Sequence, residues 1–308
     1  MEPIQPIEPT EAPEPTQPTP PQQTPTAPPE PAENHWIQQP ATTTEEIRLR
    51  HEANRVAWNE AASAYSTELE QTIAELRAGT SHLHPLERAA LGDLRPWCTR
   101  AVHLQCASGA DTISLLLEGA TEVVGVDISD AHIANARRTA EALDAPATFL
   151  RCDVLDTPHD LDGTADLVYT GRGALCWIHD LDGWAAVVAR LLAPGGVLSI
   201  LEDHPAKFLF RTDSDRLDPS GQDYFQHAEA NRGWGEQYIG GDGVTRQAVK
   251  HERIWPLSAV VQALIDQGLV IRRLEEHPVD YWQAFPHLPE DLRRTLPMTF
   301  LLLAAKPR

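Results

Sequence analysis

Residues 101–129 read AVHLQCASGADTISLLLEGATEVVGVDIS, and this stretch decides the fold. Its apolar runs at 101–105 and 121–126 have the length of buried strands, and residues 110–117 between them are helix-like and stop at Gly119. A strand, a helix and a second strand in this order are typical of a parallel sheet. The stretch therefore predicts one strand–helix–strand unit.

The same alternation continues to the end of the chain. Further strands are predicted at 147–150, 167–170, 197–201, 269–274 and 298–304, with helical stretches between most of them. Regular alternation predicts an α/β fold with a doubly wound, Rossmann-like sheet, here of seven strands. Two additions are predicted, a helical cap before the first strand and a lid insertion after the fifth.

The N-terminal region divides into two parts. Residues 1–40 hold 13 of the 26 prolines and six glutamates but no Lys or Arg, which predicts a disordered tail. Thr43 and Glu46 then have the spacing of a capping box that opens a long helix to about Arg77. We assign residues 41–100 to the helical cap and 101–308 to the main domain.

Residues 205–256 interrupt the alternation. They are rich in glycine, aromatic and charged residues and have no clear periodicity, so we interpret them as an insertion over the carboxyl edge of the sheet. The aromatic residues near flexible glycines suit a lid that closes over an apolar substrate, with packing inside the insertion as the alternative. They are Tyr224, Phe225, Trp234 and Tyr238.

Composition disfavours several classes of protein. The net charge is −20, of which six charges lie in the tail, and no basic cluster offsets the acidic remainder, so we expect no nucleic-acid partner. No apolar run reaches the roughly 18 residues that span a membrane, and the first residues lack the pattern of a signal peptide. The four cysteines have no zinc spacing. We expect a cytoplasmic protein with reduced thiols and no metal site.

Polar residues follow the first three strands in order. Gly109, in the loop after the first strand, allows close backbone approach before a helix. Asp127 ends the second strand and could accept hydrogen bonds from both hydroxyls of a ribose, and Asp153 follows the third strand and could meet an adenine amine. Doubly wound sheets bind ligands at these strand ends. Each aspartate alone could simply cap a helix.

With these residues in place, the chain resembles the class I S-adenosylmethionine-dependent methyltransferases, in their small-molecule branch. The resemblance extends from about Arg55 to the C-terminus. It rests on VVGVDIS (123–129), the pair at 152–153, LLAPGG (191–196) and WNEAA (58–62). The first loop of that family usually reads Asp-x-Gly-x-Gly-x-Gly, and this chain has His103, Gln105, Ala107 and Gly109 at those places.

The resemblance implies a cofactor, a sheet and a set of site residues. The cofactor would be S-adenosylmethionine, the acceptor a small molecule, and the last strand would insert antiparallel. The helix that carries Trp58 and Tyr65 would cover the methionine end of the cofactor. The implied cofactor-binding residues are Trp58, Tyr65, Gln105, Cys106, Gly109, Asp127, Ile128, Asp153, Val154 and Thr170.

Other functions stay open at this point. An NAD(P)-dependent oxidoreductase would use the same acid after the second strand, but a pyrophosphate needs several glycines, and Ala107 is awkward there. A non-catalytic nucleoside-binding protein of the same fold is the third reading. For catalysis we single out His204 and His251 as candidate general bases, with a structural hydrogen bond as the alternative for each. Methyl transfer from a sulfonium also proceeds without a base once the reactants are aligned.

Overall fold

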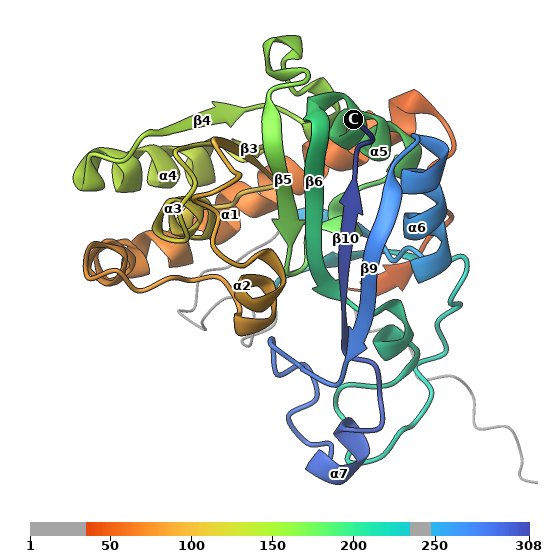
Figure 1. Cartoon of the computed structure of the whole chain (residues 1–308). Helices are drawn as coiled ribbons and strands as arrows, with labels where there is room; N and C mark the ends of the chain where they lie inside the picture. Colours follow the sequence, from red (N-terminus) through yellow and green to blue (C-terminus); the bar gives the residue numbers. More distant parts are fainter. Residues whose placement is uncertain (1–34, 235–247) are drawn as a thin grey trace, which may run out of the picture. The chain divides into compact units, whose positions relative to one another are not determined.

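Seven strands build the central sheet of this computed structural model, which describes residues 35–234 and 248–308 (Figure 1). Their order across the sheet is β4-β3-β2-β5-β6-β10-β9. They are β2 (Arg100–Leu104), β3 (Glu122–Asp127), β4 (Ala147–Arg151), β5 (Ala165–Gly171), β6 (Leu192–Asp203), β9 (Val270–His277) and β10 (Thr299–Ala305). The first five are parallel, and β10 pairs antiparallel with β6 and β9. The predicted sheet and its antiparallel last strand are confirmed.

Helices cover both faces of this sheet. On one face, Trp184 of α5 and Leu264 of α6 are fully buried against Val168 and Ile200 of the strands. Burying apolar side chains of this size stabilises the fold by roughly 1.5–3 kcal/mol each. The other face is covered by α1 and the helices that follow it. The helices are α1 (Thr44–Arg77), α2 (Pro85–Leu91), α3 (Ala110–Leu117), α4 (Asp130–Leu143), α5 (Leu181–Leu191), α6 (Leu257–Asp266) and α7 (Glu290–Arg293).

The long helix α1 begins at the predicted capping box. The Thr43 hydroxyl accepts the Glu46 N–H at 3.2 Å, and the Glu46 carboxylate accepts the Thr43 N–H at 3.1 Å. Further along, the Asn54 side chain pairs with the backbone of His251, donating to its carbonyl at 2.9 Å and accepting its N–H at 2.6 Å. The helix therefore begins where the sequence predicts, and it is hydrogen-bonded to the insertion.

The insertion after β6 contains strands that the sequence pattern does not predict. Strands β7 (Ala228–Arg232) and β8 (Val249–Arg253) pair antiparallel, and β1 (His35–Ile37) pairs with β7 on the other side. We call this three-stranded unit the lid sheet. Residues 235–247, which include Tyr238 of the predicted lid aromatics, lie outside the described residues.

Strand β1 corrects the predicted boundary of the tail. His35–Ile37 fall inside the segment 1–40 that composition predicts to be disordered, and for these residues the prediction is wrong. The His35 imidazole lies 2.9 Å from a Glu229 carboxylate oxygen of β7, and Trp36 lies under the guanidinium of Arg232. Three residues are too few to show a strand period, and their partners are far away in the sequence. Residues 1–34 lie outside the described residues.

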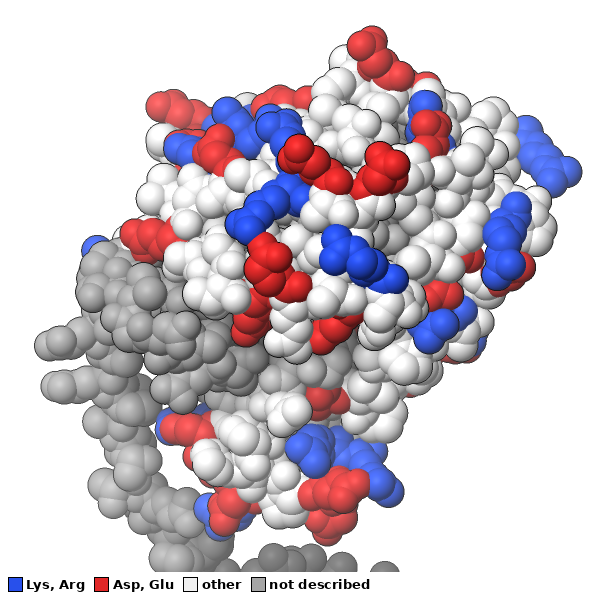
Figure 2. All heavy atoms as spheres, turned by 90° about the vertical axis from the view of Figure 1, so that its left-hand side faces the viewer, with Lys and Arg blue, Asp and Glu red and all other residues white. Residues whose placement is uncertain are grey.

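Charges on the surface are mixed. On the face shown in Figure 2, the described basic side chains lie among acidic ones. Arg55, for example, contacts Glu52 at 2.6 Å and Asp130 at 2.5 Å. No helix among the described residues combines the length and the apolarity that crossing a bilayer requires.

Candidate active site

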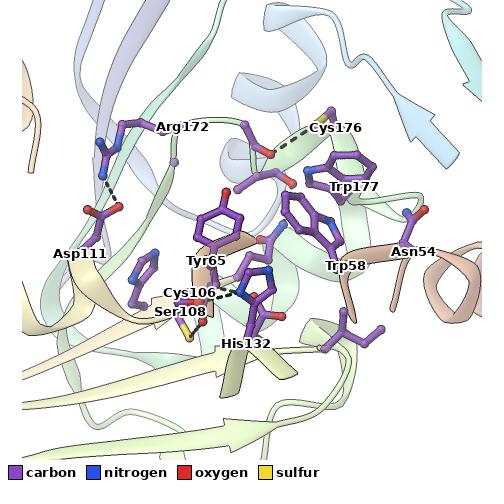
Figure 3. A pocket seen from close by; sticks show the side chains of 18 of the residues that line it. Asn54, Trp58, Tyr65, Cys106, Ser108, Asp111, His132, Arg172, Cys176 and Trp177 are labelled. Atoms are coloured by element: carbon purple, nitrogen blue, oxygen red, sulfur yellow. Dashed lines mark hydrogen bonds and ion pairs between the residues drawn. The ribbon is translucent and has the colours of Figure 1, made fainter. Parts of the chain in front are cut away.

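A cavity of about 430 Å³ lies at the carboxyl ends of the parallel strands, between α1 and the lid sheet. The predicted site residues divide into two groups around it. Eight of the ten predicted cofactor residues line the cavity: Trp58, Tyr65, Gln105, Cys106, Asp127, Ile128, Asp153 and Val154. Gly109, Thr170 and the two predicted bases, His204 and His251, do not line it. Figure 3 shows Tyr65 and Trp58 projecting from α1 into the space.

The Asp127 carboxylate is held rigidly at the end of β3. One oxygen accepts the Ala107 N–H and the other accepts the Ser129 N–H, both at 2.8 Å. Burial raises the pKa of Asp127 to about 6, against the opposing effect of these backbone hydrogen bonds. An ionised carboxylate has about four acceptor positions, so two stay available to a ligand in the cavity.

The loop after β2 keeps a glycine-type backbone with few glycines. Gln105, Ala107 and Gly109 have φ angles of 58°, 45° and 81°, all left-handed. These are the three places where the pattern quoted above has glycine. Gly109 has a packing role, since a Cβ there would lie 2.9 Å from both Ala136 Cβ and the Phe149 ring. The loop conformation is therefore retained although two of the three glycines are missing.

This strain makes Ala107→Gly an expected stabilising change. A non-glycine residue in the left-handed region destabilises the folded state by about 1–2 kcal/mol. Glycine removes this strain, but part of the benefit is offset because glycine also raises the conformational entropy of the unfolded chain. We expect the free energy of unfolding, measured in urea, to rise by about 0.5–1 kcal/mol. Gly109→Ala is the matched control and should destabilise, because its added methyl group clashes. A loss of stability in Ala107→Gly would contradict the assignment of strain.

Gln105 and Thr170, two other predicted residues, differ in their position relative to the cavity. The Gln105 side chain donates to the Ala174 carbonyl at 2.6 Å, and its own carbonyl oxygen is buried without a partner among the described residues. Thr170 is fully buried within β5 and does not line the cavity. Only Gln105 of these two is placed to meet a ligand.

Asp153 lines the cavity, but its carboxylate is largely engaged. One oxygen accepts from Arg48 and His51 of α1, both at 2.8 Å, and the other accepts the Leu155 N–H at 3.0 Å. The second nitrogen of His51 accepts the His179 N–H at 3.1 Å. Asp153 therefore joins α1 to the sheet, and this geometry does not favour the predicted contact with an adenine amine.

An ion-pair cluster at the other end of the cavity was not predicted. Arg172, directly after β5, pairs with Asp111 in the first turn of α3, and its Nε lies 3.9 Å from Glu87. The Glu87 carboxylate is fully buried, accepts the Tyr169 hydroxyl at 2.5 Å, and has a pKa raised to about 7, chiefly by burial. An isolated arginine between two glycines was the only sequence signal for this cluster.

His132 and an aromatic cluster complete the wall. The His132 ring lies between Trp58 and Tyr65, with centroid distances of 5.4 and 4.9 Å. Its Nδ1 is 2.8 Å from the Ser108 hydroxyl, its Nε2 has no partner among the described residues, and burial lowers its pKa to about 4. Trp58, Trp177 and Trp234 contact one another at centroid distances of 4.4–5.6 Å. We call these three residues the tryptophan cluster.

The predicted bases lie elsewhere. His204 caps the short helix that follows β6, accepting the Ala206 N–H at 3.1 Å, and its Nε2 contacts Glu276 at 2.8 Å. His251 lies on β8, where successive side chains point to opposite faces, so that Lys250 and Glu252 line the cavity and His251 does not. The sequence positions of the two histidines do not show which way their side chains point, and we assign neither histidine a catalytic role.

Comparison with known proteins identifies the domain. Residues 101–196 match a family described as a methyltransferase domain. A solved S-adenosylmethionine-dependent methyltransferase from Mesorhizobium loti is 29% identical, with a TM-score of 0.53 over 72% of this chain and 96% of that one. The chain carries a class I S-adenosylmethionine-dependent methyltransferase domain.

Curated relatives match a shorter stretch of the chain. A demethylmenaquinone methyltransferase from Thermus thermophilus is 36% identical over 126 residues, 37% of this chain and 56% of that protein. A trans-aconitate 2-methyltransferase from Acidovorax sp. (strain JS42) is 29% identical over 40% of this chain and 46% of that protein. The chain spans about half the length of the curated relatives that it matches.

The methyltransferase cavity fits the polar ends of S-adenosylmethionine. Two buried atoms of its lining, Gln105 Oε1 and His132 Nε2, have no partner among the described residues, and Arg172 Nε has no hydrogen bond there. Buried polar atoms in native proteins are normally satisfied, so a polar ligand is expected beside them. The acceptor positions left on Asp127 match ribose hydroxyls, and the Asp111–Arg172 pair matches an amino-acid zwitterion.

Proposed function

We propose that this methyltransferase domain transfers the methyl group of S-adenosylmethionine to a small-molecule acceptor in the same cavity. The observation that carries the proposal is the Asp127 carboxylate, fixed by two backbone N–H groups in the wall of a cavity that also holds a tryptophan cluster. The curated relatives named above, which act on demethylmenaquinone and trans-aconitate, support a small organic acceptor.

Different residues of the cavity would bind different groups of the cofactor. Asp127 would accept the ribose hydroxyls, because its remaining acceptor positions face the cavity. Asp111 would take the amino group of the methionine end and Arg172 its carboxylate, since a zwitterion complements an ion pair. Tyr65 would add its hydroxyl at the same end, as it makes no hydrogen bond to a described residue.

When bound, S-adenosylmethionine supplies an electrophilic methyl group on a sulfonium. The chain's own residues have to align the acceptor with that methyl group and exclude water. The tryptophan cluster draws on three separate segments, α1, the turn at Leu175–Trp177 and the end of the lid sheet, and so closes the apolar side of the cavity. Because neither predicted histidine base lines the cavity, we propose that transfer proceeds by alignment and does not depend on His204 or His251.

Calorimetry tests this proposal and its alternatives. The full chain should bind S-adenosylmethionine and its demethylated product, S-adenosylhomocysteine, and should not bind NAD⁺. Preference for NAD⁺ would overturn the proposal in favour of an oxidoreductase. Transfer of labelled methyl from S-adenosylmethionine to compounds of a small-metabolite extract should follow, and binding without any transfer would indicate a non-catalytic nucleoside-binding protein.

Tyr65→Phe tests the predicted hydroxyl contact. The Tyr65 ring packs edge-on against His132, and burial raises the pKa of Tyr65 to about 12, so the hydroxyl is neutral and available as a donor. Losing one hydrogen bond to a charged group should weaken S-adenosylmethionine binding about fivefold or more by calorimetry. The cofactor-free protein should keep its melting temperature. Unchanged affinity would leave Tyr65 with a packing role only.

A further inference from the structure

We propose that the acceptor carries an anionic oxygen, a carboxylate or a phenolate, that pairs with the ammonium group of Lys250. This inference rests on the proposed function and extends it from a small molecule to a chemical class of acceptor. Lys250 lies on β8 of the lid sheet and lines the cavity together with Glu252, two residues along the same strand.

Lys250 is a largely buried residue whose ammonium group lies at the cavity and makes no hydrogen bond to a described residue. Its exposed fraction is 6%, and its Nζ lies 3.7 Å from Glu252 and 4.8 Å from the centre of the Trp234 ring. No hydrogen bond joins it to a described residue. An ammonium group has three donors, and none of those of Lys250 is used by a described residue. Lys250 can therefore donate hydrogen bonds to an anionic group of a molecule in the cavity.

The two other lysines of the chain provide the contrast. Lys207 is 2% exposed and its Nζ contacts Asp203 at 2.5 Å. Lys306 donates to the carbonyls of Ala189 and Leu192, both at 2.8 Å. Both ammonium groups are satisfied inside the protein. Lys250 differs from them because its ammonium group has no hydrogen-bond acceptor among the described residues, and a ligand would supply one.

Glu252 does not neutralise Lys250 well. The distance between their charged groups exceeds that of a hydrogen bond, and the nearer Glu252 oxygen already accepts from the Asn231 side chain at 3.0 Å. Glu229, the neighbour of Glu252 across the lid sheet, adds a second negative charge, and burial together with this charge raises the pKa of Glu252. Lys250 therefore retains attraction for an incoming anion.

The residues around Lys250 indicate the chemistry of the rest of the acceptor. The tryptophan cluster lies beside Lys250, with Trp234 in direct contact with its ammonium group. Flat, apolar molecules stack well on indole rings. The acceptor class is thus a flat, apolar or unsaturated body that ends in one anionic oxygen.

A matched pair of ligands tests the charge preference. In the full chain saturated with S-adenosylhomocysteine, trans-cinnamate and trans-cinnamamide are titrated by calorimetry, because they share a shape and differ in charge. The wild type should bind cinnamate about tenfold or more tighter than the amide, the effect of one charge-assisted hydrogen bond. Lys250→Met should abolish the difference, and Lys250→Arg should retain most of it.

Controls separate this inference from the proposed function. Arg232→Met removes a positive charge from an exposed position of the same lid sheet, outside the cavity, and should keep the preference. Lys250→Met should keep its affinity for S-adenosylhomocysteine, which reports folding and the cofactor site. Equal affinity of the wild type for the two ligands, no binding of cinnamate, or a preference that survives Lys250→Met would overturn the inference. Failure of the wild type to bind S-adenosylhomocysteine would instead count against the proposed function.

Discussion

Replacing Asp127 with alanine should weaken S-adenosylhomocysteine binding about a hundredfold or more, because two hydrogen bonds to a charged group contribute roughly 1.5–3 kcal/mol each. Calorimetry on the full chain measures this loss. The variant also frees the Ala107 and Ser129 N–H groups, so the melting temperature of the cofactor-free protein has to be recorded alongside. Near-native affinity in a folded Asp127→Ala protein would contradict the ribose assignment.

The same carboxylate predicts the pH dependence of binding. Because its pKa is raised to about 6, Asp127 is protonated in the cofactor-free protein at pH 5 and ionised at pH 7. Only the ionised form accepts with both oxygens, so affinity should fall by about tenfold between pH 7 and pH 5. Glu87, with a pKa of about 7, also titrates in this range, beside Arg172. The Asp127→Asn variant removes the titration of Asp127, so the pH dependence that remains comes from other groups. A slope that survives in Asp127→Asn would assign the dependence to another group, such as Glu87 or Glu202, whose pKa is also raised to about 7.

Replacing Glu87 with alanine should lower the free energy of unfolding by about 3 kcal/mol, through loss of a buried hydrogen bond, a helix cap and packing. The change leaves the Tyr169 hydroxyl without its acceptor at a fully buried position, and it removes the acceptor of the His84 N–H at the start of α2. Urea denaturation gives the value directly.

A double-mutant cycle checks the origin of that loss. In the Tyr169→Phe background the hydroxyl is already gone, so Glu87→Ala should cost less than in the wild type. Equal costs in both backgrounds would show that the Tyr169–Glu87 hydrogen bond contributes nothing to stability.

The sheet could be predicted because its signals are local. Apolar runs, stop signals and the capping box at Thr43 each lie within a few residues, and the structure confirms the elements they predict. Asp127 could be found for the same reason, since a parallel strand fixes the place of the residue that ends it. The position of Tyr65 in the cavity wall followed from the resemblance of its helix, and not from periodicity.

The missed features depend on partners distant in the sequence. Strand β1 exists through β7, and the Arg172 cluster joins residues from α2, α3 and the end of β5. The positions of His204 and His251 outside the cavity lining could not be predicted for another reason, because the place of a residue in the sequence does not say which way its side chain points. His251 and Lys250 are neighbours in the sequence, but successive side chains of a strand point to opposite faces, so Lys250 lines the cavity and His251 does not.

The pairing of His35 with Asn231 has a consequence for synthesis of the chain. Strand β1 leaves the ribosome among the first described residues, but its partner β7 emerges only after the strands β2 to β6, and β8 later still. Such long-range pairings form late, because the intervening chain has to be ordered first. A nascent chain can therefore assemble the parallel core while the wall that carries Lys250 is still missing. The lid-sheet wall of the cavity therefore forms after the parallel strands that it covers.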